Sequence, residues 1–223
     1  MSWTLYRHYK GRDYLRLGVA VHSEDTSQLV VYRCLYGDPP SGNWVRPQAM
    51  FEGRLDDGGE RFAPIAHVRV VQPEDNATVL RFGYDAWSEG RTLDEFVASY
   101  EQSLNHQRGT RYLLEDLNGT PLSSLNTLRF RQGLVGIASV ATTPEHRGCG
   151  HASRLVRAVM ELLRFQEESV RFMLFCEVNP AFYARHGFRE LSGEHQRFLP
   201  SVAMITGEAS LSTEEAVFLE KYF

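Results

Sequence analysis

Apolar and polar positions alternate with a short period over the first 65 residues. Residues 14–22 place Leu15, Leu17, Val19 and Val21 on one side, and similar runs occupy residues 5–9, 29–35 and 44–47. Strict alternation is typical of half-buried strands, and polar turns separate these runs. The pattern predicts a small antiparallel β-barrel of four or five strands. The acidic, glycine-rich stretch at 56–60 is typical of the edge of a linker.

From residue 67 onward, longer helices and strands follow one another. Strands are predicted at 67–71, 111–115, 122–130, 134–141, 170–177, 188–191 and 202–206. Helices are predicted from Pro73, from Thr92 to about Asn105, from Gly150 to Gln166, and from Ala181 to His186. The third helix has an apolar face at helical spacing. Its residues are Leu155, Val156, Val159, Leu162 and Leu163. We therefore predict three segments: a β-barrel at 1–65, an α+β domain with a mixed sheet at 66–206, and a helical tail at 207–223.

Composition limits the classes of function. The net charge of −4 gives no basic excess, which argues against binding of nucleic acid. No apolar run is long enough to cross a membrane, and the first residues lack the apolar core of a signal peptide. Cys34, Cys149 and Cys176 are too few and too scattered for a disulfide framework or a zinc site. We expect a cytoplasmic protein without a metal.

Residues 143–152 join a predicted strand to a predicted helix. Gly148 and Gly150 let backbone N–H groups face a bound anion, and the helix N-terminus adds further free amides. This arrangement predicts a pyrophosphate site. A P-loop is excluded because His151 and Ala152 stand where Lys and Ser or Thr are needed. A Rossmann turn is excluded because residues 142–147 separate the strand from the glycines.

A second motif follows the next strand. It runs from Asn179 through Phe182 and Tyr183 to Gly187 and Phe188. Together with the sequence Arg-Gly-Cys-Gly-His-Ala at 147–152, it resembles the Gcn5-related N-acetyltransferase (GNAT) family. That family has the signatures Arg/Gln-x-x-Gly-x-Gly/Ala and Asn…Phe-Tyr-x-x-x-Gly-Phe in this order. The resemblance covers about residues 67–206 and implies the acyl-CoA N-acyltransferase fold.

The resemblance also implies how acetyl-CoA, the acyl-donor substrate, would bind. The strand at 134–142 would splay from the strand at 170–177, and the pantetheine arm would pair with backbone groups near Val140 and Thr142. Asn179 would bond the pantetheine. The pyrophosphate would be held by the amides of Arg147, Gly148, Cys149, Gly150, His151 and Ala152. Cys149 is expected to be a passive loop residue.

Thioester chemistry suggests roles for two catalytic residues. A neutral amine attacks the carbonyl, and the leaving thiolate then needs a proton. The hydroxyl of Tyr183 has an ordinary pKa of about 10 against about 8.5 for a thiol, so it can act as the general acid. Packing of an aromatic ring is the alternative interpretation of Tyr183. Glu177 and Glu115 are the two candidates for the base that accepts the amine proton.

The N-terminal segment resembles a second family, DUF1653, over residues 3–65. The similar stretches are 6–11, 17–24, 29–32, 35–37 and 44–47. The resemblance leads us to expect an SH3-like barrel. Its aromatic and basic surface consists of Tyr6, Arg7, His8, Trp44 and Arg46. This surface either binds a peptide or steers the acceptor, or its residues simply pack and pair with one another.

The function expected from these features is transfer of an acetyl group from acetyl-CoA to a primary amine in a ternary complex. The acceptor is an amine-bearing small molecule or protein. Tyr84, Trp87 and Tyr100 are expected near the acceptor as core or lid residues. The alternative is a non-catalytic acyl-CoA-binding sensor or scaffold whose barrel recruits a partner. The tail offers Val217, Phe218, Leu219 and Phe223 for a homodimer.

Overall fold

The computed structural model describes residues 1–37, 42–130, 133–167 and 169–217. The strands are β1 (Ser2–His8), β2 (Asp13–Val21), β3 (Gln28–Cys34), β4 (Trp44–Pro47), β5 (Phe62–Val70), β6 (Thr110–Glu115), β7 (Pro121–Arg129), β8 (Leu134–Thr142), β9 (Arg171–Cys176), β10 (Phe188–Glu190) and β11 (Val202–Thr206). The α-helices are α1 (Gln48–Phe51), α2 (Asn76–Leu80), α3 (Tyr84–Trp87), α4 (Leu93–Gln102), α5 (Leu104–Arg108), α6 (His151–Gln166), α7 (Ala181–Ala184) and α8 (Thr213–Ala216). Short 3₁₀ turns are η1 (Pro73–Asp75), η2 (Arg81–Gly83), η3 (Pro144–His146) and η4 (Gly193–His195).

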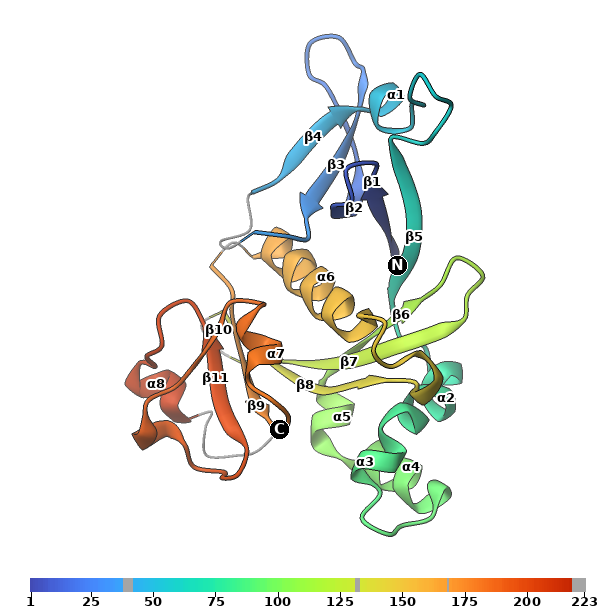
Figure 1. The fold of residues 1–223 in the computed structure, drawn as a ribbon. Coiled ribbons are helices and arrows are strands. Elements are labelled where there is room, and N and C mark those ends of the chain that lie inside the picture. The colour runs from blue at the N-terminus through green and yellow to red at the C-terminus, as the bar shows by residue number, and fades with distance from the viewer. Residues whose placement is uncertain (38–41, 131–132, 168, 218–223) are drawn as a thin grey trace.

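All the strands join one open sheet in the order β10-β11-β9-β8-β7-β6-β5-β1-β2-β3-β4. Only β8 and β9 pair in parallel among the described strands. Helix α6 packs on one face of the sheet, whereas α2 and η2 pack on the other face through Val79 and Phe82 against Leu113. Figure 1 shows α6 lying between the N-terminal strands and β6–β8, with α2–α5 beyond these strands. The mixed sheet predicted for the second segment is confirmed.

The predicted closed barrel at the N-terminus is wrong. In the described residues, β4 pairs with β3 alone, and the opposite edge of this group continues through β5 into β6. The concave side is filled by aromatic side chains instead of being closed by strand pairing. Phe51 of α1 stacks on Phe62 of β5 with ring centroids 4.2 Å apart, and Tyr32 packs beside them.

The N-terminal strands share a core with the rest of the chain. Leu5 and Leu15 are fully buried in the same cluster as Leu155 of α6. The boundary proposed at residues 65 and 66 falls inside β5, which pairs with β1 along its length and with β6 through its second half. The division into segments 1–65, 66–206 and 207–223 stays a prediction, and its first boundary runs through a hydrogen-bonded strand.

The helix caps agree with the sequence patterns. Thr92, the predicted start of the second helix, accepts a hydrogen bond from the backbone of Glu95, and the two form a capping box for α4. That helix ends at Gln102 because Ser103 is extended, and α5 continues to Arg108.

In the tail, which was predicted to be helical, Ser212 caps α8 by accepting a hydrogen bond from the backbone of Glu215. Phe218, Leu219 and Phe223, which were expected to extend this helix and form a dimer face, lie outside the described residues. No helix in the described part of the chain is both long enough and apolar enough to cross a membrane.

Candidate active site

The parallel strands β8 and β9 separate halfway along their length. They pair only where Leu134–Gly136 meets Arg171–Met173, although the strands continue to Thr142 and Cys176. A register shift against β7 and the positive φ of Ser139 (49°) mark a bulge in β8 at this point. Bulges bend the strand that carries them. The splay expected from the sequence is therefore present, and Val140 and Thr142 lie beyond the last β9 pair.

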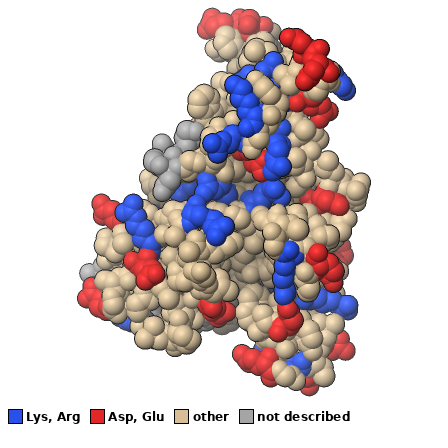
Figure 2. All heavy atoms as spheres, in the orientation of Figure 1, with Lys and Arg blue, Asp and Glu red and all other residues tan. Residues whose placement is uncertain are grey.

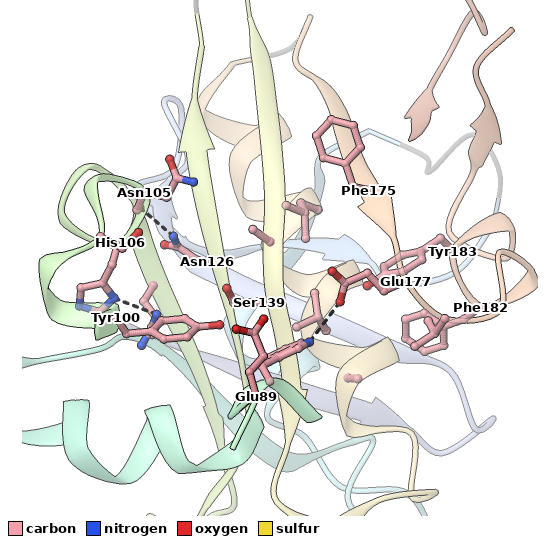
Figure 3. Close-up of a pocket in the computed structure, with 18 of the residues that line it drawn as sticks. Glu89, Tyr100, Asn105, His106, Asn126, Ser139, Phe175, Glu177, Phe182 and Tyr183 are labelled. Carbon is pink, nitrogen blue, oxygen red and sulfur yellow. Dashed lines mark hydrogen bonds between the residues drawn. The ribbon is translucent and has the colours of Figure 1, made fainter. Parts of the chain in front are cut away.

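A cavity of about 450 Å³ opens beside the bulge. Helices α3–α5 supply one wall, the bulge supplies the floor, and the end of β9 together with α7 supplies the other wall (Figure 3). Its lining residues are Trp87, Glu89, Arg91, Tyr100, Ser103, Asn105, His106, Arg111, Asn126, Ile137, Ala138, Ser139, Val140, Ala152, Phe175, Glu177, Val178, Phe182 and Tyr183.

Both residues predicted to be catalytic line this cavity. Tyr183 on α7 is buried, and its ring packs against Phe182 and Phe188. Glu177 follows β9 directly, and its Oε2 accepts a hydrogen bond from Trp87 Nε1 at 3.1 Å. The other candidate base, Glu115, does not line the cavity. Its carboxylate lies 2.9 Å from Arg69 Nε, in a salt bridge at the far end of β6.

The glycine loop has the backbone geometry that an anion site needs. Gly148 and Gly150 have φ of +79° and +80°, a region that favours glycine. The backbone N–H of Arg154 donates to the carbonyl oxygen of Gly150, the N-cap residue, at 3.0 Å, and this bond begins the helical pattern of α6. The amides before Arg154 are those that a helix start leaves without intrahelical partners.

The side chain of Arg147 points away from this anion site. Its guanidinium donates two hydrogen bonds to Asp85 of α3, at 2.6 and 2.8 Å, and one to Thr142 O at 3.1 Å. Hydrogen bonding within this pair raises the pKa of Arg147 and lowers the pKa of Asp85. Arg147 therefore fixes the loop through its side chain and leaves only its backbone for a phosphate.

The structure brings only some of the predicted site residues together. Val140, Ala152, Glu177 and Tyr183 line the cavity. The others lie outside its lining, at the end of β8, in the loop before α6, at the first residue of α6 or before α7. They are Thr142, Arg147, Gly148, Cys149, Gly150, His151 and Asn179.

Asn179 and Cys149 have local contacts of their own. Asn179 Oδ1 accepts the Ala181 amide at 2.9 Å, so its side chain caps the turn into α7. Cys149 is exposed, and its Sγ lies 3.8 Å from Arg147 O. Neither contact involves a group in the cavity wall.

Sequence reasoning missed the polar end of the cavity. Arg111 of β6, His106 of α5 and Asn126 of β7 gather there around Tyr100. Burial is the main cause that raises the pKa of Tyr100 and lowers the pKa of His106. One signal was available. Arg111 precedes the apolar run Tyr112–Leu114 of β6, and it stands two residues from the fully buried Leu113 and therefore on the same face.

The aromatic and basic surface of the N-terminal segment is largely occupied by its own contacts. Tyr6 packs on Phe51, His8 packs on Phe62, and Arg7 pairs with Asp13 at 2.8 Å. Among residues 1–37 and 42–65, none belongs to the lining of the cavity. These contacts favour the interpretation that the residues pack and pair over the interpretation that they steer the acceptor.

Comparison with known families gives two matches. Residues 4–64 match a family model described as a protein of unknown function, DUF1653. Residues 109–190 match an acetyltransferase (GNAT) domain. Both families and their order agree with the resemblances seen in the sequence. No curated protein matches the chain.

Solved structures agree on the fold. A chimera of the spermidine N-acetyltransferase SpeG from Vibrio cholerae and hSSAT aligns with a TM-score of 0.50 at 16% identity, over 62% of this chain and 94% of the other. A mutant of SpeG from Vibrio cholerae aligns with a TM-score of 0.50 at 18% identity, over 63% of this chain and 92% of the other. At such identities the likeness shows a shared fold alone.

Proposed function

Because this chain carries a GNAT acetyltransferase domain C-terminal to a DUF1653 domain, we propose that it acetylates a primary amine held in the cavity beside β8. One observation carries the proposal. The gap between β8 and β9 opens into a cavity whose walls hold Tyr183 and Glu177. A thioester that enters through the gap would meet both side chains and an acceptor in the same space.

The residues around the gap fit acetyl-CoA. Beyond Gly136, the backbone of β8 has no β9 partner in the described structure, so it can pair with a pantetheine arm. The free amides at the start of α6 suit a pyrophosphate. Next to Gly150, a second hollow is lined by Arg154, Arg157 and Arg185, which offer positive charge for further phosphate. Figure 2, which has the orientation of Figure 1, shows basic side chains gathered near the middle of the molecule.

The proposed reaction is a direct transfer in a ternary complex. The neutral amine nitrogen bonds to the thioester carbonyl carbon, and backbone N–H groups of the β8 bulge stabilise the resulting oxyanion. The carbon–sulfur bond then breaks. The thiolate takes a proton from the Tyr183 hydroxyl, and the amine loses a proton to Glu177, directly or through water.

Two variants of the full chain test these roles. Tyr183→Phe should lower kcat on the order of 100-fold, in line with the loss of a general acid, while KM for acetyl-CoA changes little. Glu177→Gln should lower kcat on the order of 100-fold, in line with the loss of a general base. Tyr112→Phe is the matched control, since this buried tyrosine lies on β6 outside the cavity. Unchanged turnover in Tyr183→Phe would refute the acid role and leave packing as its function.

A panel of amines separates catalysis from sensing. CoA release is followed with each amine, and binding of acetyl-CoA alone is measured by isothermal titration. Turnover with any amine supports the transferase. Binding without turnover on any member of the panel favours the sensor or scaffold. The cytoplasmic location and the lack of a metal stay predictions from the sequence.

A further inference from the structure

A buried positive charge lies at the end of the cavity away from Tyr183. The Arg111 side chain lines the cavity and is only 8% exposed. Its Nη2 lies 2.9 Å from His106 Nδ1, the contact drawn from His106 in Figure 3. Its Nη1 is buried and has no hydrogen-bond partner in the described residues. No carboxylate of the described chain lies within salt-bridge distance of this guanidinium, whereas other buried arginines such as Arg33 are paired.

An uncompensated charge of this kind is unfavourable. Moving a cation out of water costs several kcal/mol unless an opposite charge and hydrogen bonds offset the loss. Burial lowers the pKa of Arg111 to about 10, so the group stays protonated at neutral pH. Burial and the nearby Arg111 lower the pKa of His106, which keeps the imidazole neutral. Tyr100 has a raised pKa and is neutral as well. Arg91 also lines the cavity, but it is paired with Glu89 at 3.4 Å, so Arg111 is the cation of the lining that has no carboxylate partner among the described residues.

The opposite end carries the reverse charge. Glu177 belongs to the lining, and Figure 3 places Tyr100 and His106 on one side of Ser139 with Glu177 and Tyr183 on the other. The cavity is thus polarised, with the Arg111 cation at one end and the Glu177 carboxylate near the proposed site of transfer. A ligand that matches it has an ammonium group at one end and an anionic group at the other.

We propose that the acceptor is an amino acid or short peptide whose carboxylate pairs with Arg111 while its amine faces Glu177 and Tyr183. The planar fork of a guanidinium fits a carboxylate with two parallel hydrogen bonds. A cavity of about 450 Å³ is at the small end of ligand pockets, which suits such an acceptor. A polyamine such as spermidine, which carries only positive charge, would be repelled at this end. This inference rests on the proposed transferase function.

The test compares acceptors that differ only in the carboxylate. Full-length protein and acetyl-CoA are offered amino acids, the same amino acids as amides, and spermidine, and CoA release is measured. The acids should exceed their amides at least tenfold in kcat/KM. Arg111→Met should abolish this preference and raise KM for the acids at least tenfold, with KM for acetyl-CoA unchanged. Arg81→Met is the control, because Arg81 is exposed and lies outside the cavity lining.

A second measurement keeps the two proposals apart. N-acetylated amino acids and their amides are product analogues, and their binding by titration needs no turnover. Tighter binding of the acid in the wild type, lost in Arg111→Met, would support the carboxylate site even if no amine reacts. A preference for amides or spermidine, or a preference for acids that survives in Arg111→Met, would overturn it.

Stability distinguishes a binding cation from a structural one. Arg111→Met removes an unpaired buried charge, so its melting temperature without ligand should equal or exceed that of the wild type. A fall in melting temperature together with an unchanged preference for acids would show that Arg111 serves the fold alone. Arg111→Lys keeps the charge but not the planar fork of the guanidinium. Its affinity for the acids should lie between that of the wild type and that of the methionine variant.

Discussion

Helix α6 carries a buried carboxylate on the side that faces the N-terminal strands. Glu161 is 1% exposed, and it accepts hydrogen bonds from Arg33 of β3 and Arg164 of its own helix, both at 2.7 Å. The two guanidinium groups offset the loss of hydration that burial imposes on the carboxylate. Because Arg33 belongs to the N-terminal strands, this cluster joins segment 1–65 to the catalytic domain. We predict that Glu161→Gln strongly destabilises the whole chain.

The size of the effect follows from burial. Glutamine keeps the shape of the side chain but removes its charge, and it leaves Arg33, whose side chain is 9% exposed, without a counter-ion. Breaking a buried ion pair in this way costs about 3–5 kcal/mol. For a chain of 223 residues, each kcal/mol shifts the melting temperature by about 2–4 °C. The melting temperature should therefore fall by roughly 6–20 °C.

Thermal and urea unfolding followed by circular dichroism measure this change. The matched control is Glu167→Gln, which removes the same charge from an exposed pair with Arg129 at 3.0 Å. Exposed pairs contribute about 0–1 kcal/mol, so the control should change stability by no more than that. A Glu161→Gln variant that unfolds within 1 kcal/mol of the wild type would refute the reasoning from burial.

Two further predictions concern the loop and the packing of α7. Gly150→Ala should raise KM for acetyl-CoA and leave KM for the acceptor unchanged in steady-state assays, because φ of +80° strains alanine by about 1–2 kcal/mol; Gly193→Ala, at a glycine with ordinary φ and open space, is the control. His186 is neutral in the fold because burial lowers its pKa from 6.5 to about 4. The unfolded chain binds this proton below about pH 6.5, so stability should fall by up to about 3 kcal/mol between pH 6.5 and 4. Urea unfolding at a series of pH values measures this loss of stability, and His186→Gln should lack it. An equal loss of stability in the wild type and in His186→Gln would contradict the prediction.

The local sequence pattern predicted most helices and strands, because the period of apolar residues and the helix caps are local properties of the sequence. The apolar face of α6, the box at Thr92 and the two glycines of the loop each specify a backbone conformation within a few residues. The splay of β8 was expected from the family resemblance, and the bulge at Ser139 explains it physically.

Pairing over long distances was less predictable. The stretch 56–60 was interpreted as the edge of a linker, but Gly58 has φ of +85° and the segment turns tightly before β5. The following strand begins at Phe62 instead of His67, so it pairs with both β1 and β6. Alternation along one strand does not reveal its neighbours, and the closed barrel was wrong for this reason.

The cavity shows the same limit. Tyr100, Arg111 and Asn126 come from three elements, and only the folded sheet brings them to one wall. The local sign of the polar end was Arg111, a charged residue on the same face of β6 as the buried Leu113. That Arg111 Nη1 has no hydrogen-bond partner among the described residues could be seen only in the folded structure, where its neighbours are known.

Strand β5 has a practical consequence for dissecting the protein. A fragment that starts at residue 66 would keep only half of this strand, and the half that remains would lose β1 as its neighbour. An exposed row of unpaired N–H and C=O groups invites edge-to-edge aggregation. Insolubility of such a truncated fragment would then report a damaged sheet edge and would say nothing about whether the catalytic half can work alone.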